Sequence, residues 1–297
     1  MQEDIGTSRA ASQPPVSEEG GDAGTVVGTA TDRTGDTESV AKTDFPGTGG
    51  VSLVGSGPGH PELLTRRAWH RLQSADVVLY DSLTGDAIVD AVPATAETID
   101  VGKRPPNRTS QAEINELMCT RASEGEYVVR LKGGDPNVFG RGGEEAEHLA
   151  VEEVPFEVVP GISSVLAASS VSGIPLTHRH CSSSLTVITG HQTPEKADSA
   201  IDWPAIADSI DAGGTLIVLM GVSKLPENVR ALRDHGVPAE TPVAMVENVS
   251  LDTERTIVGT LDTIVSRSES AGIESPAVTI VGEVVTVRED VSDLLQR

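Results

Sequence analysis

The 297-residue sequence is short of several residue types, and each shortage narrows the range of functions. It has two cysteines, Cys119 and Cys181, which are too few for a disulfide framework and form no cluster of metal ligands. No stretch approaches the roughly 18 consecutive apolar residues of a membrane span. The start of the chain has no charged segment followed by an apolar one, so we expect no secretion signal. These absences predict a cytoplasmic protein without a metal site.

Basic residues are also scarce, with 22 Lys and Arg against 45 Asp and Glu and a net charge of -23. An excess of this size argues against nucleic acid or an anionic membrane as a partner. The acids are scattered rather than clustered, a composition that resembles the proteins of salt-loving microbes, where salt screens the repulsion. Each remaining Lys or Arg is therefore of interest as a functional residue.

Residues 1–48 contain little that could form a core. They are rich in Gly, Thr, Ser and Asp, and Phe45 is their one aromatic residue. Such a segment buries too little apolar surface to offset the entropy of ordering the chain. We therefore predict a disordered acidic tail.

The segment after the tail has the pattern of a nucleotide-binding βαβ unit. Residues 51–54 are an apolar run typical of a buried strand, and residues 77–80 are a second run that ends in Asp81. Four apolar residues between the two runs are spaced to share one helical face: Leu63, Leu64, Trp69 and Leu72. Strand, glycine turn, helix, strand and acid follow in the order of a nucleotide site.

The glycine turn at 55–59 departs from the dinucleotide fingerprint. Its glycines allow the backbone to approach a ligand closely, but His60 stands where that fingerprint has its third glycine. Pro58 also lacks an N–H at the point where a pyrophosphate needs donors. This pattern favours a nucleoside-like ligand with little phosphate, such as S-adenosyl-methionine, over a merely structural turn.

A second dense segment follows the predicted strand at 127–131. A Gly-Gly-Asp triplet at 133–135 lies just beyond that strand, where open α/β sheets place their ligands. Glu144 and Glu145 suit the first turn of the next helix, whose positive end favours acids. Basic residues in and near this segment indicate either an anionic ligand or local salt bridges: Arg104, Arg130, Lys132 and Arg141.

Strands and helices alternate along the rest of the chain, which predicts an α/β protein. The other predicted strands are 97–101, 156–159, 185–189, 215–220, 243–247, 255–259 (antiparallel to its neighbour) and 277–287. The predicted helices are 86–92, 111–122 behind a capping box at Ser110 and Glu113, 203–210, 226–235, 261–267 and 291–295. A Gly and Pro break near 172–182 predicts a junction between an N-terminal domain, 49–175, and a C-terminal domain, 176–297.

Five segments together resemble the tetrapyrrole methylase superfamily, in the branch that methylates uroporphyrinogen III. They are LVGSGPGHPELLT, ADVVLYDSL, VGKR, VVRLKGGDPNVFGRGGEE and VVPGISSVLAASSVSGIPLTHR. The resemblance covers roughly residues 51 to 290. It implies two α/β domains, the first with a mostly parallel sheet and the second with a mixed sheet. It also implies an active site in the cleft between them, and a homodimer.

The resemblance also implies a reaction and a set of site residues. Members use S-adenosyl-methionine to methylate pyrrole carbons C2 and C7 of uroporphyrinogen III, giving precorrin-2 for sirohaem and cobalamin. By motif match, Asp81 would accept a proton and Lys103 would donate one. The residues expected to hold S-adenosyl-methionine are Pro58, Gly133, Gly134, Asp135, Val138, Ser163, Ser164, Met220 and Val249.

The substrate implied by the resemblance carries eight carboxylates, which guanidinium and ammonium groups can bind. The candidates are Arg104, Arg130, Lys132, Arg141 and Arg179. Structural ion pairing remains the alternative for each of them.

Departures from the family pattern are few. His60 stands where many members have Asp, Ser163 and Ser164 replace a frequent Thr-Ala, and Val249 replaces a frequent Gly. The sequence shows no fused dehydrogenase or ferrochelatase module, so we expect the methyltransferase alone. The alternatives are a later corrin methyltransferase, a diphthine synthase, a nicotinamide-dependent oxidoreductase and a non-catalytic tetrapyrrole-binding protein.

Overall fold

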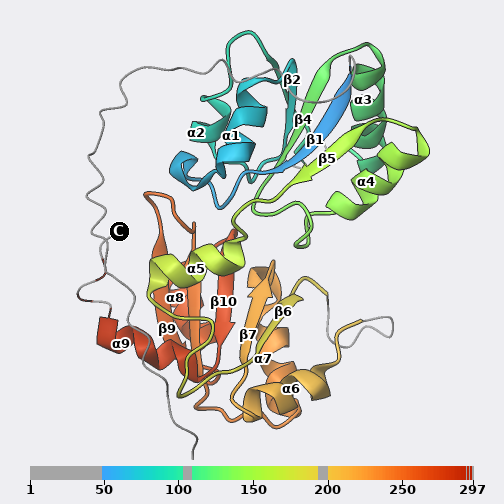
Figure 1. The fold of residues 1–297 in the computed structure, drawn as a ribbon. Helices are drawn as coiled ribbons and strands as arrows, with labels where there is room; N and C mark the ends of the chain where they lie inside the picture. The colour runs from blue at the N-terminus through green and yellow to red at the C-terminus, as the bar shows by residue number, and fades with distance from the viewer. Residues whose placement is uncertain (1–48, 103–108, 193–199, 292, 294, 296–297) are drawn as a thin grey trace, which may run out of the picture. The chain divides into compact units, whose positions relative to one another are not determined.

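The computed structural model describes residues 49–102, 109–192, 200–291, 293 and 295. The predicted tail, 1–48, and the site candidates Lys103 and Arg104 lie outside the described residues. The described chain contains two five-stranded sheets with helices on both faces of each (Figure 1). The predicted α/β class, with one parallel and one mixed sheet, is confirmed.

The first sheet is parallel in all the pairings that the structure describes. Its strands are β1 (Gly50–Gly55), β2 (Val77–Tyr80), β3 (Glu97–Asp100), β4 (Tyr127–Lys132) and β5 (Phe156–Val159). They lie in the order β3-β2-β4-β1-β5. The central strands β1 and β4 are buried along their whole length, as expected for a parallel sheet covered on both faces.

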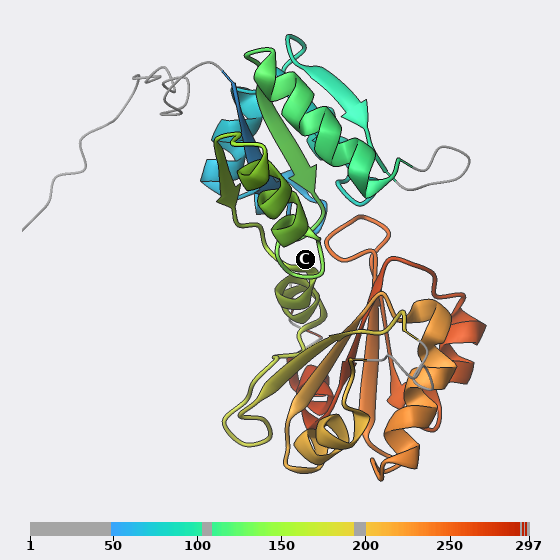
Figure 2. The ribbon, with the colours of Figure 1, turned by 90° about the vertical axis from the view of Figure 1, so that its right-hand side faces the viewer.

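Two helices cover each face of the first sheet. On one face lie α1 (Arg66–Gln73) and α2 (Asp86–Val89), after a short 3-10 turn, η1 (Pro61–Leu63). On the other face, α3 (Gln111–Ser123) and α4 (Gly142–Val151) lie side by side, as Figure 2 shows. This pairing of α3 with α4 places polar groups from both helices over β4.

The structure confirms the capping box at the start of α3 but corrects the expected face of α1. Ser110 accepts a hydrogen bond from the Glu113 backbone, and the Glu113 side chain accepts one from the Ser110 N–H. In α1, Ala68 and Leu72 are the buried residues, whereas Trp69 is 40% exposed. The predicted Leu72 is buried, and Leu64 packs against the same core although it precedes α1, so the prediction was wrong for Trp69 and for the start of the helix.

The second sheet is mixed. Its strands are β6 (Leu185–Thr189), β7 (Thr215–Leu219), β8 (Pro242–Glu247), β9 (Arg255–Thr260) and β10 (Ala277–Val281), in the order β6-β7-β10-β8-β9. The β6–β7 pairing is parallel, and the others described are antiparallel. The helices that follow are α6 (Trp203–Asp211), α7 (Leu225–Asp234) after η2 (Val222–Lys224), and α8 (Ile264–Ala271). The predicted antiparallel strand at 255–259 is confirmed as β9.

Two predicted elements near the C-terminus were wrong in extent. The strand expected over 277–287 ends at Val281, because Gly282 has a positive φ of 132° and turns the chain into η3 (Glu283–Thr286). The final helix, expected at 291–295, is α9 (Val287–Val291). Apolar residues continue through this region, so composition alone gave no signal for the strand's end.

Helix α5 (Ser164–Ser172) packs on the second sheet. Its Val165, Ala167 and Ala168 share a core with Ile217 of β7 and Ala244 of β8. The small residues noted in this segment allow that close packing. The junction expected near residue 175 stays a prediction, and this packing favours a junction before α5.

No helix in the described part of the chain is long and apolar enough to span a membrane.

A polar network on the edge strand β5 leads to a prediction for stability. Glu157 accepts hydrogen bonds from Ser52, at 2.8 Å, and from Arg71, at 2.5 Å. Ser52 in turn lies 2.6 Å from the Tyr127 hydroxyl. Burial raises the pKa of the Glu157 carboxyl, but the hydrogen bonds from Arg71 and Ser52 outweigh it and lower the pKa below its ordinary 4.5.

Replacing Glu157→Gln is expected to lower the free energy of unfolding at pH 7 by about 1–3 kcal/mol, because the hydrogen bonds from Arg71 and Ser52 lose their charged acceptor. A lowered pKa in the folded state stabilises the protein above pH 4.5, and this stabilisation disappears as pH falls further. The gap between wild type and variant should therefore narrow below about pH 4.5 in urea titrations. The exposed Glu116→Gln is the control. A gap that stayed constant down to acid pH would contradict this account.

Candidate active site

Three loops meet at one edge of the first sheet. They follow β1, β4 and β5, whose carboxyl ends lie together because the strands are parallel and adjacent. From β1 the chain crosses to β2 and β3 at one side of the sheet, whereas from β4 it crosses to β5 at the other side. This edge therefore includes the point where the direction of the strand order reverses. Open α/β sheets bind their ligands in the crevice at such a point.

Backbone hydrogen bonds join these three loops. Gly57 N–H donates to the Gly134 carbonyl at 3.1 Å, and Gly134 N–H donates back to Gly57 at 2.8 Å. The third loop is tied in by Asp135, whose Oδ2 accepts a hydrogen bond from Gly161 N–H at 3.1 Å. The loop after β4 is therefore bonded both to the loop after β1 and to the loop after β5.

The loops approach more closely than residues with side chains would allow. A Cβ added to Gly161 would lie 2.2 Å from the Gly134 carbonyl oxygen and 2.7 Å from the Gly55 Cα. One added to Gly55 would lie 2.5 Å from the Gly161 nitrogen. These contacts involve backbone atoms, which cannot rotate away. The sequence predicted a ligand loop at 55–59, but nothing in it indicated the contact with Gly161.

Seven of the nine residues expected to hold S-adenosyl-methionine lie in these loops or at the start of α5. They are Pro58, Gly133, Gly134, Asp135, Val138, Ser163 and Ser164. Asp135 is fixed by a hydrogen bond from the Asn137 N–H to its Oδ1 at 2.9 Å. Ser163 caps α5 by accepting from the Val165 N–H at 3.3 Å. Val138 is 38% exposed and available to a ligand.

The other two expected residues, Met220 and Val249, belong to the second sheet. They follow β7 and β8, which both run antiparallel to β10 and therefore end at the same edge. Met220 has a positive φ of 54° and is 48% exposed, a strained conformation that is more common at functional sites. Val249 is only 6% exposed and packs in the core, so its backbone is the part available to a ligand.

Asp81, the expected proton acceptor, lies directly after β2. Its Oδ1 accepts a hydrogen bond from Leu83 N–H at 3.1 Å, which fixes the turn. Its Oδ2 lies 3.7 Å from Nη2 of Arg130, and the side chain is 26% exposed. The carboxylate is thus held at Oδ1, and the side chain as a whole is partly exposed to solvent.

Arg130 and Lys132 are buried and form ion pairs within the protein, whereas a residue that binds substrate carboxylates is expected to be exposed. They are 4% and 3% exposed, and both contact the fully buried Glu145 of α4. Arg130 Nε lies 3.1 Å from Oε1 of Glu145, and Lys132 Nζ lies 2.8 Å from Oε2. Of the two alternatives that the sequence left open, this geometry favours salt bridges.

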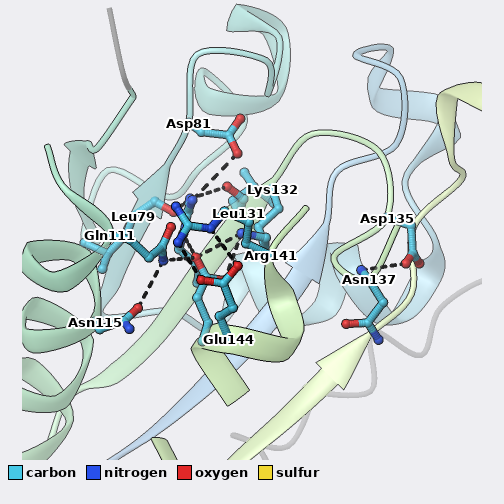
Figure 3. Close-up of polar contacts among 12 residues, drawn as sticks. Leu79, Asp81, Gln111, Asn115, Leu131, Lys132, Asp135, Asn137, Arg141 and Glu144 are labelled. Atoms are coloured by element: carbon cyan, nitrogen blue, oxygen red, sulfur yellow. Dashed lines mark hydrogen bonds and ion pairs between the residues drawn. The ribbon is translucent and has the colours of Figure 1, made fainter. Parts of the chain in front are cut away.

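Glu145 also accepts a hydrogen bond from Gln111 of α3 at 3.1 Å, and Gln111 donates to Asn115 at the same distance. Figure 3 shows Gln111, Asn115 and Lys132 of this cluster, together with Asp81. Burial lowers the pKa of the Lys132 ammonium, as does the neighbouring Arg130, against the opposing effect of Glu145. The sequence pattern predicted only that Glu145 lies at the start of a helix, and its central position in this cluster was not predicted.

The two remaining basic candidates that the structure describes, Arg141 and Arg179, are both exposed. Arg141 pairs with Glu144 at 2.5 Å, and its side chain is 43% exposed. Arg179 is exposed, in the loop before β6. In the described ranges, no group of three or more His, Cys, Asp and Glu residues could hold a metal ion.

The sequence and the fold are both similar to those of known proteins. The model of the family described as Tetrapyrrole (Corrin/Porphyrin) Methylases matches residues 50–265. The chain belongs to this family. Its fold matches a crystal structure of uroporphyrin-III C-methyl transferase from Thermus thermophilus complexed with S-adenyl homocysteine, with a TM-score of 0.69. That match has 39% identity and covers 80% of this chain and all of the other.

Curated relatives share more of the sequence. An S-adenosyl-L-methionine-dependent uroporphyrinogen III methyltransferase from Methanosarcina barkeri is 51% identical over 81% of this chain and 94% of the relative. A siroheme synthase from Gluconobacter oxydans is 47% identical over 81% of this chain, but the match covers only 50% of that longer protein. The chain thus matches nearly all of the first relative and half of the second.

Proposed function

We propose that this protein methylates two pyrrole carbons of uroporphyrinogen III with S-adenosyl-methionine, giving precorrin-2. The observation that carries the proposal is the 51% identity to the Methanosarcina barkeri methyltransferase, across 94% of that protein. The intact Gly-Gly-Asp triplet and the position of Asp81 support it from the structure.

The residues of the first sheet's loops fit a nucleoside-like donor. Gly57, Gly134 and Gly161 add no side chains where the loops meet, and Pro58 withholds an N–H where a phosphate would need one. When bound, S-adenosyl-methionine supplies a methyl group on a positively charged sulfur. Asp135, Ser163 and Met220 are the residues proposed to hold it, with the others named above.

The protein's own task is alignment and charge control. An electron-rich pyrrole carbon needs correct placement more than activation, since alignment alone can remove much of the barrier. After the carbon has been methylated, the ring carries a positive charge and loses a proton. Asp81, whose side chain is partly exposed, stabilises that charge and accepts the proton. Arg141 and Arg179 are the exposed cations proposed to bind the substrate's carboxylates.

The proposal extends to the setting of the enzyme. Two free cysteines agree with a reducing cytoplasm, and the net charge of -23 agrees with a salt-loving source. An archaeal source is proposed because the relative from Methanosarcina barkeri is archaeal. A homodimer is proposed from the family resemblance. Light scattering on a sizing column, in high and low salt, would give twice the chain mass if this is right, and the chain mass if it is wrong.

Anaerobic incubation of the purified protein with uroporphyrinogen III and S-adenosyl-methionine, in high salt, tests the activity. The expected result is the absorption spectrum of sirohydrochlorin after oxidation of the product, or red fluorescence from a trimethylated by-product. An unchanged substrate would contradict the proposal. Hydride exchange with a nicotinamide cofactor would indicate an oxidoreductase instead.

A further inference from the structure

The buried Glu145 has no part in the proposed reaction. It contacts Arg130, however, and the guanidinium of Arg130 also lies near Asp81. We propose that Glu145 is a positioning residue that holds the Arg130 guanidinium back from Asp81 and so keeps Oδ2 of Asp81 open. This inference rests on the proposed function, because it assigns Asp81 its part in methyl transfer.

The distances show two carboxylates sharing one guanidinium unequally. Arg130 Nε is within hydrogen-bond distance of Glu145, at 3.1 Å, whereas Nη2 is 3.7 Å from Asp81. The second distance is longer than a charged hydrogen bond, which is about 2.7–2.9 Å. Arg130 Nη1 also donates to the Leu131 carbonyl at 3.0 Å, which fixes the plane of the guanidinium. Arg130 therefore faces Asp81 without closing on it.

Burial makes Glu145 the stronger partner. Glu145 is fully buried and Asp81 is 26% exposed, so water screens the attraction of Arg130 to Asp81 more than its attraction to Glu145. Lys132 contacts Glu145 as well, and the four charges sum to zero. Gln111, from α3, donates a hydrogen bond to Oε1 of Glu145, the oxygen that Arg130 Nε also contacts.

Removing the charge of Glu145 would change this balance. Arg130 and Lys132 would then have one carboxylate between them, Asp81, and a guanidinium fork matches a carboxylate at two oxygens. The closed ion pair would occupy Oδ2, the oxygen that the reaction needs. Removing the Glu145 charge would therefore slow the chemical step, and it would leave the loops around Gly134 and Gly161 intact.

Kinetics of Glu145→Gln test this directly. We expect kcat to fall about 10- to 100-fold, as for a displaced catalytic group. The KM for S-adenosyl-methionine and the Kd for S-adenosyl-homocysteine should not change. The control is Glu147→Gln, which makes the same substitution at an exposed position of the same helix and should keep wild-type kcat. Loss of kcat only in proportion to the unfolded fraction would overturn the inference.

A double-mutant cycle separates positioning from mere support of the fold. If Glu145 acts through Asp81, the double variant Glu145→Gln/Asp81→Asn should be no slower than Asp81→Asn alone. If the fold-reductions in kcat of the two single variants multiplied in the double variant, the two residues would act independently, and the inference would be overturned. Where Glu145→Gln fails to fold, Glu145→Asp keeps the charge but is shorter by one methylene. It should fold and show an intermediate kcat, and an unchanged kcat would contradict the proposal.

A crystal structure of Glu145→Gln, or of Glu145→Asp where the first does not fold, gives a readout that needs no turnover. We expect Arg130 to move from its 3.7 Å position to direct hydrogen bonds with Asp81. An unmoved guanidinium would overturn the positioning role even in an active enzyme. Wild-type protein that transfers no methyl group would instead refute the proposed function, so the two failures are distinguishable.

Discussion

Gly161→Ala is expected to lose binding of S-adenosyl-homocysteine by about 100-fold or more. Its new Cβ would meet the Gly134 carbonyl oxygen at 2.2 Å and the Gly55 Cα at 2.7 Å. Neither atom belongs to a flexible side chain, so the loops after β1, β4 and β5 must separate. The Gly161 N–H to Asp135 hydrogen bond would be disrupted by the same movement. Calorimetric titration of the whole protein gives the Kd.

The same substitution should lower the free energy of unfolding by about 1–3 kcal/mol or more, the usual cost of overpacking. Gly143→Ala is the matched control, because a Cβ there meets nothing within 4 Å. As an alanine inside α4, it should stabilise the protein slightly and leave binding unchanged. Wild-type affinity in Gly161→Ala would show that the contact among the three loops does not matter for the ligand.

Asp81→Asn is expected to reduce turnover by about 100- to 10,000-fold, the range for loss of a group that transfers a proton. The amide keeps the size of the side chain and can still accept a hydrogen bond from Leu83. It can neither take up the proton nor stabilise the charged ring as a carboxylate does. Binding of S-adenosyl-homocysteine should therefore stay at the wild-type level.

The control for this variant is Asp90→Asn, which removes one negative charge at the exposed end of α2. This control measures how much the loss of one negative charge alone changes turnover of the anionic substrate. Unchanged turnover in Asp81→Asn would remove Asp81 from the mechanism. Loss of cofactor binding together with turnover would instead assign it a structural role in the turn.

Local patterns predicted the elements around the site well. The apolar runs gave β1 and β2 to within a residue or two at each end, and the Ser110–Glu113 pair predicted the start of α3. The alternation of strands and helices gave the α/β class. These features depend on neighbours in the chain, which a sequence displays directly.

Contacts between distant segments could not be predicted in the same way. Gly161 touches Gly55 and Gly134 across gaps of many residues, and α5 joins the core of the second sheet. One signal was available but unused. Arg130 and Lys132 alternate with buried apolar residues in β4, so both cations face the helices α3 and α4. Two buried cations on one covered face require a buried acid, and Glu145 supplies it.

Counting transferred methyl groups tests the central claim most directly. The protein is incubated anaerobically with uroporphyrinogen III and S-adenosyl-methionine labelled with ¹³C in its methyl group. The mass of the oxidised product is then measured by mass spectrometry. The account predicts sirohydrochlorin with two labelled methyl groups, both bonded to ring carbons. Uroporphyrinogen III recovered without label, while the protein still binds S-adenosyl-homocysteine, would contradict it.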